Sequence, residues 1–304
     1  MELGKILSKA FDTTFKHKYL WLLSFLAIIG GVASETQFNF NFQFPSELFS
    51  NTPPDTIQDI FDTISSNIYS YIPIIIIVLL ILLLISIALL IIGLIAKAGQ
   101  IDSFLQIDQN KSSGFYPAMS SGKHYAWRIF LLRLIYGISC FVSILILIPL
   151  IIITFLFFFI TIPLTIIYFG ILSILLKNTE ILIIKNNLGI IEAIKQSWHL
   201  TCQHWKDILF LWLVNFGIQI GISIVFFFFG IIIFIFSVFL AIIFGVLVMS
   251  TELSFVIPIL IFLAIFIILI AIAISLIIGS ILHTFFTGYW TFGINSLLPK
   301  KTNK

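Results

Sequence analysis

The basic residues of this 304-residue chain fall only in four short regions, and long apolar runs separate these regions. The sixteen Lys and Arg residues lie before Tyr19, from Lys97 to Arg133, from Lys177 to Lys206, and after Pro299. The stretch 34–70 has no basic residue but carries five acids: Glu35, Glu47, Asp55, Asp59 and Asp62. Basic residues stay on the cytoplasmic side during membrane insertion. The pattern therefore predicts a multi-pass protein of the cell membrane with its N- and C-termini in the cytoplasm.

The composition excludes an ordinary soluble domain. Only 10% of the residues are charged, whereas a soluble domain has roughly 25%. Several apolar runs exceed the ~18 residues that indicate a membrane-spanning helix. The net charge of +3 is spread over short flanks, so nothing indicates a nucleic-acid partner. Two cysteines, Cys140 and Cys202, provide no disulfide framework.

We predict a single all-α membrane domain with six transmembrane helices. The expected spans are 19–33, 72–96, 127–149, 152–176, 207–229 and 255–283. Between the first two lies the loop 34–70, expected outside the cell; its segment 37–44 alternates polar and aromatic residues. That segment suits an irregular loop touching headgroups better than a half-exposed strand. A tight turn near Pro149 must separate spans three and four, because fifty helical residues would measure about 75 Å against a hydrocarbon core of about 30 Å.

The apolar run 207–249 raises the same problem of length, since one straight helix would measure about 64 Å. Two full spans there would place the C-terminal lysines outside, against the charge rule. One span followed by a re-entrant or tilted segment at 230–250 keeps those lysines inside and leaves Glu252 outside with the other acids. We therefore prefer six spans, with seven as the alternative.

Three regions of the chain share a pattern that suggests an internal repeat. His17, His124 and His204 each precede a tryptophan at the start of a span. Amphipathic helices are predicted at 1–18 and 187–205, since their apolar residues recur at i, i+3 and i+4. The corresponding middle segment, 114–122, is short and broken by Ser and Gly. Under this interpretation the chain consists of three interfacial helices, each followed by a hairpin of two spans. Alternatively, the three regions are similar only because any such hairpin needs basic and aromatic residues at its cytoplasmic start.

Few side chains offer chemistry inside the predicted bilayer. The candidates for a polar pocket are Arg133, Asn215, Gln219 and His283. For each, a simpler role is expected: Arg133 would snorkel to the cytoplasmic face, and the two amides, which share a helix face, would join helices. His283 would be a satisfied interfacial histidine. Apart from Asp207 at the first position of span 207–229, no acid lies within a predicted span, which disfavours a proton-coupled transporter.

No catalytic residues, cofactor or metal site are predicted. His199, Cys202 and His204 cluster on one amphipathic helix, which is a poor tetrahedral frame for a metal. The basic and aromatic residues Lys195, Trp198, Trp205 and Lys206 instead predict a face for anionic lipid headgroups or a cytoplasmic protein partner. We expect a non-catalytic membrane module that associates with lipid or recruits a partner. The alternative is a passive transporter or lipid-translocating bundle with its site between spans three and six.

One segment resembles a known family. It reads EILIIKNNLGIIEAIKQSWHLTCQHWKDILFLWL, and its matching positions are Gly189, Glu192, Ala193, Ser197 and Trp198. This segment and the six-span layout resemble the glycerophosphoryl diester phosphodiesterase membrane-domain family and related bacterial and archaeal membrane proteins. The Asp-Leu-Arg-like element that follows a tyrosine in that family is missing after Tyr289. The resemblance implies the membrane part alone, without the catalytic barrel.

Overall fold

The chain folds into helices only, over the part that a computed structural model describes: residues 2–33, 54–153, 158–250 and 256–298. This confirms the expected all-α class. The helices are α1 (Leu3–Lys16), α2 (Tyr19–Ile29), α3 (Pro54–Asp108), α4 (Phe115–Ile153), α5 (Phe158–Asn186), α6 (Ile190–Gln203), α7 (Trp205–Ser250) and α8 (Val256–Leu297).

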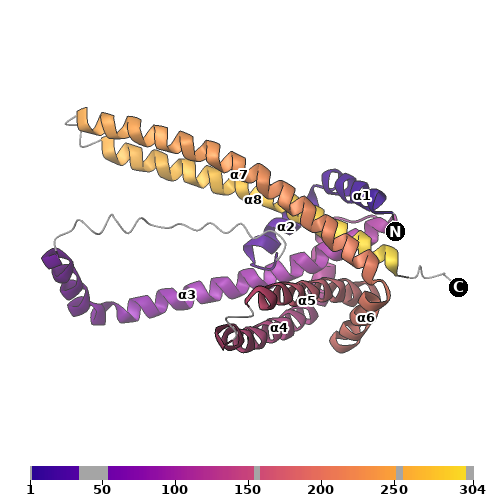
Figure 1. The fold of residues 1–304 in the computed structure, drawn as a ribbon. Coiled ribbons are helices and arrows are strands. Elements are labelled where there is room, and N and C mark those ends of the chain that lie inside the picture. The colour runs from indigo at the N-terminus through magenta and orange to yellow at the C-terminus, as the bar shows by residue number, and fades with distance from the viewer. Residues whose placement is uncertain (1, 34–53, 154–157, 251–255, 299–304) are drawn as a thin grey trace.

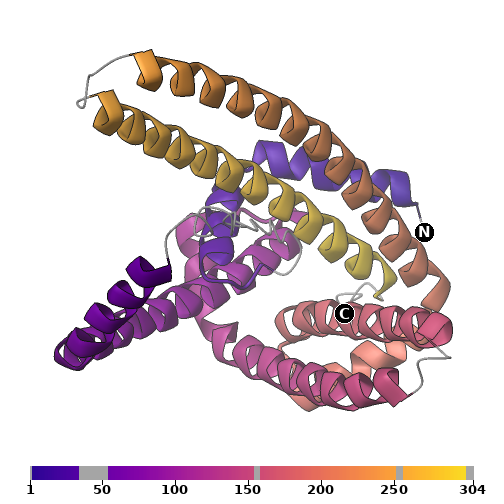
Figure 2. The same cartoon turned by 60° about the vertical axis from the view of Figure 1, so that its left-hand side comes forward.

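The helices meet at one end of the molecule and diverge from it (Figure 1). We call the packed end the base. It consists of α1, α2 and α6 together with residues 93–108, 115–136, 174–186, 205–215 and 280–297. From the base, α3, the α4–α5 hairpin and the α7–α8 hairpin project as separate arms, and a view turned by 60° shows the same divergence (Figure 2).

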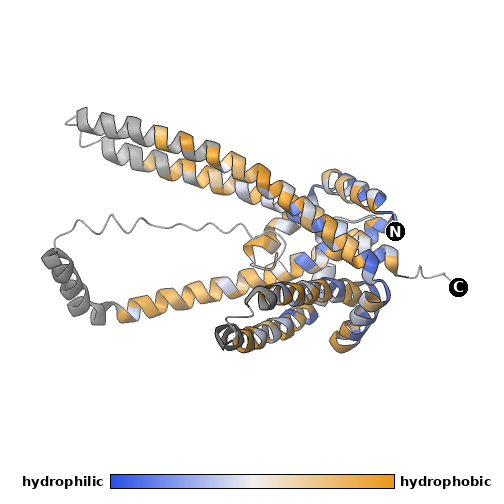
Figure 3. Cartoon of the chain, viewed as in Figure 1, coloured by the Kyte–Doolittle hydropathy of each residue, from blue (hydrophilic) through white to orange (hydrophobic). Residues whose placement is uncertain are grey.

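The arms expose apolar side chains that only lipid can solvate. In α3, every residue from 72 to 88 is exposed, and Leu79 keeps 60% of its surface accessible. Five helices contain a stretch long and apolar enough to cross a membrane, and the buried share of that stretch ranges from 0% in α3 to 39% in α5. Figure 3 shows orange apolar residues along the arms and blue polar residues gathered in the base. The polar chemistry of the described chain is therefore concentrated at one end of the membrane-spanning segments.

Glycines bring the backbones of α2, α3 and α4 into contact within the base. A Cβ on Gly99 would lie 2.3 Å from the carbonyl oxygen of Ala118, and a Cβ on Gly122 would lie 2.1 Å from that of Ile95. In the same way, a Cβ on Gly30 would meet the Cα of Gly93 at 2.6 Å. Small residues at such positions let helices approach closely in membranes, where no hydrophobic effect drives them together.

The two expected amphipathic helices are present as α1 and α6: α1 buries part of its predicted apolar face, whereas α6 buries a different face from the predicted one. Ile6, Ala10 and Thr14 of α1 are buried, while Phe11 and Phe15 remain about half exposed. In α6 the buried residues are Ala193, Ser197 and Leu200. Each helix therefore packs on the base mainly through small residues with an isoleucine or leucine among them, and keeps other aromatic or aliphatic side chains outside.

The first expected span, 19–33, differs from the prediction. Its helix α2 has eleven residues, so it is about 16 Å long and covers only about half of the hydrocarbon core. The second difference is that α3 begins at Pro54, which makes residues 54–70 helical rather than irregular. Segment 37–44 lies outside the described residues.

The expected spans 72–96, 127–149 and 207–229 each lie within a longer helix. Span 255–283 coincides with α8 from Val256 onward. Helix α5 begins only at Phe158, so residues 152 and 153 of the expected span 152–176 belong to α4. Residues 97–108 extend α3, and residues 177–186 extend α5. The middle amphipathic segment, 114–122, supplies the first turns of α4 rather than a separate helix, and α4 continues past Pro149 to Ile153. Span lengths estimated from hydropathy alone are thus shorter than these helices. A helix can continue past the hydrocarbon core where contacts with other parts of the protein satisfy its side chains.

The expected re-entrant break after Gly230 is not seen. Helix α7 continues without interruption to Ser250. Of the two expected forms of segment 230–250, only the tilted one is compatible with this continuous helix. Its 46 residues span about 69 Å, more than twice the thickness of a hydrocarbon core. A tilt or a protruding end must take up the difference.

A matched pair of glycines in α4 tests the backbone contacts. We expect Gly122→Ala to destabilise the protein by about 1–3 kcal/mol, because the added Cβ meets the backbone of α3 and forces the helices apart. Gly137→Ala is the control, since nothing lies within 4 Å of that position; alanine there should be neutral or stabilising by up to about 1 kcal/mol. Thermal unfolding in detergent would measure both. Equal effects of the two substitutions would contradict the close contact.

Candidate functional site

The short helix α2 is held in the base by two groups of buried polar side chains. One group contacts Ser24 in the middle of the helix, and the other contacts the carbonyl oxygen of Val32 just beyond its end. Polar groups inside a membrane are costly unless they bond to one another, so such groups mark either an anchor or a functional site.

The first group surrounds the Ser24 hydroxyl. Its oxygen lies 3.0 Å from His283 Nδ1 and 2.7 Å from Thr284 Oγ1, both on α8, and the amide nitrogen of Gln100 on α3 donates to it at 2.6 Å. Ser24, Gln100, His283 and Thr284 are each fully buried. Three helices are thereby joined through one hydroxyl group.

The other ring nitrogen of His283 faces a buried lysine. Lys97 Nζ lies 3.3 Å from His283 Nε2 and donates to Thr287 Oγ1 at 3.0 Å. Lys97 keeps only 2% of its surface exposed. The lysine on α3 and the histidine on α8 therefore meet inside protein, away from bulk water.

These distances specify where the protons lie. An ammonium group only donates, so Nε2 of His283 must accept from Lys97 and carries no hydrogen. Nδ1 then holds the ring hydrogen and donates it to Ser24 Oγ. Ser24 accepts from both His283 and Gln100 and uses its own hydrogen for Thr284. With Lys97 as an ammonium group, this pattern corresponds to a neutral imidazole.

The second group contains a buried ion pair. Arg133 on α4 approaches Oε1 of Glu180 on α5 through Nε and Nη2, both at 2.8 Å, and its Nη1 donates to the carbonyl oxygen of Val32 at 2.6 Å. The Glu180 side chain is 4% exposed and that of Arg133 20% exposed. The guanidinium group thus satisfies a carbonyl near the end of α2, while the carboxylate balances its charge.

The sequence at the end of α2 explains how that carbonyl comes to face Arg133. Gly31 adopts a φ of +67°, which glycine takes without strain. The amide of Val32 then bonds back to the carbonyl of Ala27 at 2.9 Å, which closes the helix. A left-handed glycine thus reverses the chain and turns it out of the helix.

The predicted pocket residues do not behave as one set. Arg133 does not snorkel to a membrane surface as expected; it pairs with Glu180 inside the base. His283 is fully buried and has hydrogen-bond partners, as expected of a satisfied histidine, and it belongs to the group around Ser24. On α7, Asn215 is buried and Gln219 is partly buried, and no hydrogen bond joins either amide to another described side chain. The structure therefore separates this set over two polar groups and a third helix.

The predicted surface residues lie on the outside of the base. Lys195 and Trp198 on α6, and Trp205 and Lys206 at the start of α7, are all exposed. The two indole side chains keep 55% and 57% of their surface accessible. The Lys206 Nζ lies 5.7 Å from the centre of the Trp205 ring, within cation–π distance. These four residues, which we call the Lys–Trp face, present cations beside amphipathic rings.

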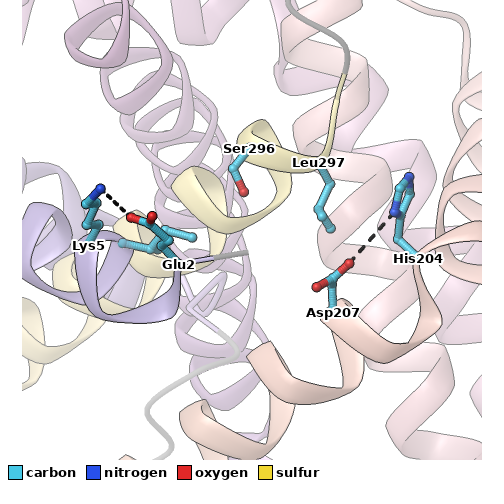
Figure 4. Close-up of a pocket in the computed structure, with 7 residues that line it drawn as sticks. Glu2, Lys5, His204, Asp207, Ser296 and Leu297 are labelled. Carbon is cyan, nitrogen blue, oxygen red and sulfur yellow. Dashed lines mark ion pairs between the residues drawn. The ribbon is translucent and has the colours of Figure 1, made fainter.

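A cavity of about 370 Å³ opens where α1, the α6–α7 junction and the end of α8 meet (Figure 4). An ion pair lies on either side: Lys5 with Glu2 on α1, and His204 with Asp207, whose atoms are 3.9 Å apart. Ser296 and Leu297 of α8 lie between them. The lining mixes both signs of charge and is largely exposed, so it favours no single class of ligand.

Two sequence signals pointed to the buried polar groups, but the predicted span boundaries hid them. Lys97 and Gln100 are spaced i, i+3, so they share a face as soon as α3 is extended past Ala96. Glu180 lies four residues past the expected end of its span, which made it look like a loop acid. The full lengths of α3 and α5 are what place these residues inside helices, and hydropathy alone does not provide those lengths.

A family model described as "Family of unknown function (DUF7544)" matches residues 8–296. No curated protein and no solved structure matches the chain. These comparisons provide no link to the glycerophosphoryl diester phosphodiesterase membrane domain, so that resemblance remains an expectation drawn from the residues.

The ion pair predicts an asymmetric response to substitution. Arg133→Gln should destabilise the protein by about 3 kcal/mol or more, because it leaves the Glu180 carboxylate buried without its cation. Replacing both partners, as Arg133→Met with Glu180→Leu, should recover most of that loss. Arg128→Gln on the same helix is the control, since Arg128 makes an exposed bond to Asn187 and should cost less than about 1 kcal/mol. Thermal unfolding of the three variants and of the unchanged protein measures this, and equal losses from the two single substitutions would contradict it.

Proposed function

The chain belongs to the DUF7544 family, whose description assigns no function, and we propose that it is a non-catalytic membrane module that gathers anionic lipid at its base. The observation that supports this most is the exposure of all four residues of the Lys–Trp face. Tryptophan prefers the interface between lipid and water, and lysine near that interface attracts anionic headgroups.

The orientation of α6 supports a lipid-facing role. Its small residues pack inward, whereas Ile191 and Trp198 point outward with 70% and 55% of their surfaces exposed. On a water-facing surface these side chains would be poorly solvated, but at a membrane interface they can enter the acyl region. Helix α1 repeats the arrangement with Phe11 and Phe15.

The packing of the two chain ends supports placing both termini on the cytoplasmic side. Lys9 of α1 pairs with Asp108 and lies 4.9 Å above the ring of Phe292, near the end of α8. Five spans alone would separate α1 from the end of α8 by the membrane, so one more crossing must occur between α1 and Ile72. The base then carries the basic residues and faces the cytoplasm.

A lipid-associated module fits the arms better than a transporter does. A transport path needs a polar lining enclosed by protein, whereas in the described spans at most 39% of the membrane-crossing stretch is buried. Arms that diverge from one another are instead surrounded by lipid over most of their length.

A triple substitution tests the proposal. Lys195→Ala, Trp198→Ala and Lys206→Ala together should weaken capture of anionic lipid about thirtyfold, since each of the two lysines contributes about 1 kcal/mol near the surface and about 1.4 kcal/mol is a factor of ten. The measurement is the fraction of labelled phosphatidylglycerol retained by the full chain in nanodiscs of mixed lipid.

The matched control removes two exposed lysines from the α3–α4 end of the base, as Lys111→Ala with Lys123→Ala. We expect the control to retain anionic lipid like the unchanged protein. Lipid retention that stays the same in the triple variant would overturn the proposal. Loss of a cytoplasmic protein in a pull-down, with lipid retention intact, would show instead that the face recruits a partner.

A further inference from the structure

Helix α1 carries three kinds of side chain on three different sides. One side packs on the base through Ile6, Ala10 and Thr14. A second side carries Phe11 and Phe15, which are about half exposed and whose ring centroids lie 4.6 Å apart. We call these two residues the Phe ridge. The third side carries most of the charged residues, so the exposed surface of α1 is divided between aromatic rings and charges.

The Phe ridge continues into the apolar surface of α2. The rings of Phe15 and Trp21 meet edge-on, with their centroids 6.0 Å apart. The Trp21 indole nitrogen holds this position by donating to the carbonyl oxygen of Thr14 at 2.8 Å. Further along α2, Leu22 and Ile29 are exposed and share one side of a helix that has no charged residue. The ridge therefore lies on the side of α1 that adjoins lipid-facing residues.

The charged side of α1 holds the helix in this orientation. About 100° separates successive residues of a helix, so Lys9 points about 160° away from Phe11 and about 120° away from Phe15. Lys9 pairs with Asp108 at the end of α3, and its Nζ lies 4.9 Å from the centre of the Phe292 ring on α8. Rotating α1 to bury the Phe ridge would break both contacts. The two rings therefore stay on the outside of the base.

The chemistry of the Phe ridge differs from that of the Lys–Trp face. Two of the three lysines in α1 already have carboxylate partners, Lys5 with Glu2 and Lys9 with Asp108. An anionic headgroup would have to compete with these acids. The rings of the ridge carry no charge, and what they require is apolar space between the lipid headgroups.

We propose that the Phe ridge inserts into the cytoplasmic leaflet and binds most tightly where the lipid headgroups are loosely packed. Opening a gap for two rings costs free energy in a tightly packed leaflet, whereas a leaflet of unsaturated lipid, or the convex side of a curved membrane, already has such gaps. Because the ridge lies on the same base, its insertion rests on the proposed lipid-facing function. It adds a contact that responds to packing, while the Lys–Trp face responds to charge.

Oxidative footprinting of the full chain in nanodiscs measures how far water reaches the two rings. At a fixed anionic fraction, a change from saturated to doubly unsaturated fluid lipid loosens the headgroup packing. We expect the modification of Phe11 and Phe15 to fall about threefold with this change. Phe227, exposed on the α7 arm, is the control, since lipid surrounds it in both cases. Equal modification of the ridge in the two lipids would overturn the proposal.

Varying the anionic fraction at fixed acyl chains separates this contact from the proposed function. Added phosphatidylglycerol should protect Trp198 of the Lys–Trp face and leave the Phe ridge unchanged. A ridge that follows the anionic fraction rather than the acyl chains overturns the packing-sensitive contact. Failure of phosphatidylglycerol to protect Trp198 counts against the proposed function alone.

Sorting on curved membrane tests the ridge by substitution. On a tube pulled from a giant vesicle, we expect the unchanged protein to be enriched about twofold over the flat membrane, and Phe11→Ala with Phe15→Ala to lose that enrichment. The matched control removes two exposed rings from the α7 arm, as Phe227→Ala with Phe228→Ala, and should keep it.

Only molecules whose base faces outward are counted. A membrane-impermeant dye on Cys202, which is exposed on α6, marks them, because Cys140 lies within the membrane-spanning part of α4. If the ridge variant is enriched on the tube as strongly as the control, the Phe ridge does not read packing and the proposal is wrong.

Discussion

The structure depends on the absence of water around the membrane-spanning helices. A polar group there has no solvent to bond with, so it must find a partner inside the protein. Within the membrane-spanning helices of the described chain, the charged side chains lie in the base, where Arg133 pairs with Glu180 and Lys97 contacts His283. The few hydroxyl groups of the arms bond locally, as Ser143 does to Tyr168 and Ser275 to the carbonyl oxygen of Ala271, so the arms can diverge into lipid.

The same constraint explains why α2 can end about halfway through the membrane. A helix end leaves carbonyl oxygens without partners. Beyond α2, the left-handed Gly31 turns the chain so that Val32 meets Arg133, and Glu180 balances the charge of that arginine. Two buried groups thus hold one short helix: an ion pair at its end, and a histidine–lysine contact through Ser24 in its middle. The first contains an ion pair, while the second joins α2 to α3 and α8 through hydrogen bonds.

Close backbone contacts complete the base. Gly30, Gly93, Gly99 and Gly122 lie where a Cβ would meet another helix, so they set the distance at which α2, α3 and α4 pack. Gly137, Gly217 and Gly221 lie on open helix surface, where an added Cβ would contact no other helix. A glycine in an apolar run therefore carries no meaning until its neighbours across the helix interface are known.

The sequence by itself determined that the chain is helical, that it carries at least five apolar stretches of membrane-crossing length, and that amphipathic helices precede the first and last hairpins. These features follow from local hydropathy and from periodicity, which need no tertiary contacts to read. Only the tertiary structure decided that α2 is a half-length helix, that α7 continues past Gly230, and that Lys97 and Glu180 lie buried rather than in loops. The physical reason is that a span boundary drawn from hydropathy assumes lipid around the helix. Where protein replaces lipid, a charged residue is stable if its partner comes from another helix, and that partner lies 47 residues away for Arg133 and 186 for Lys97.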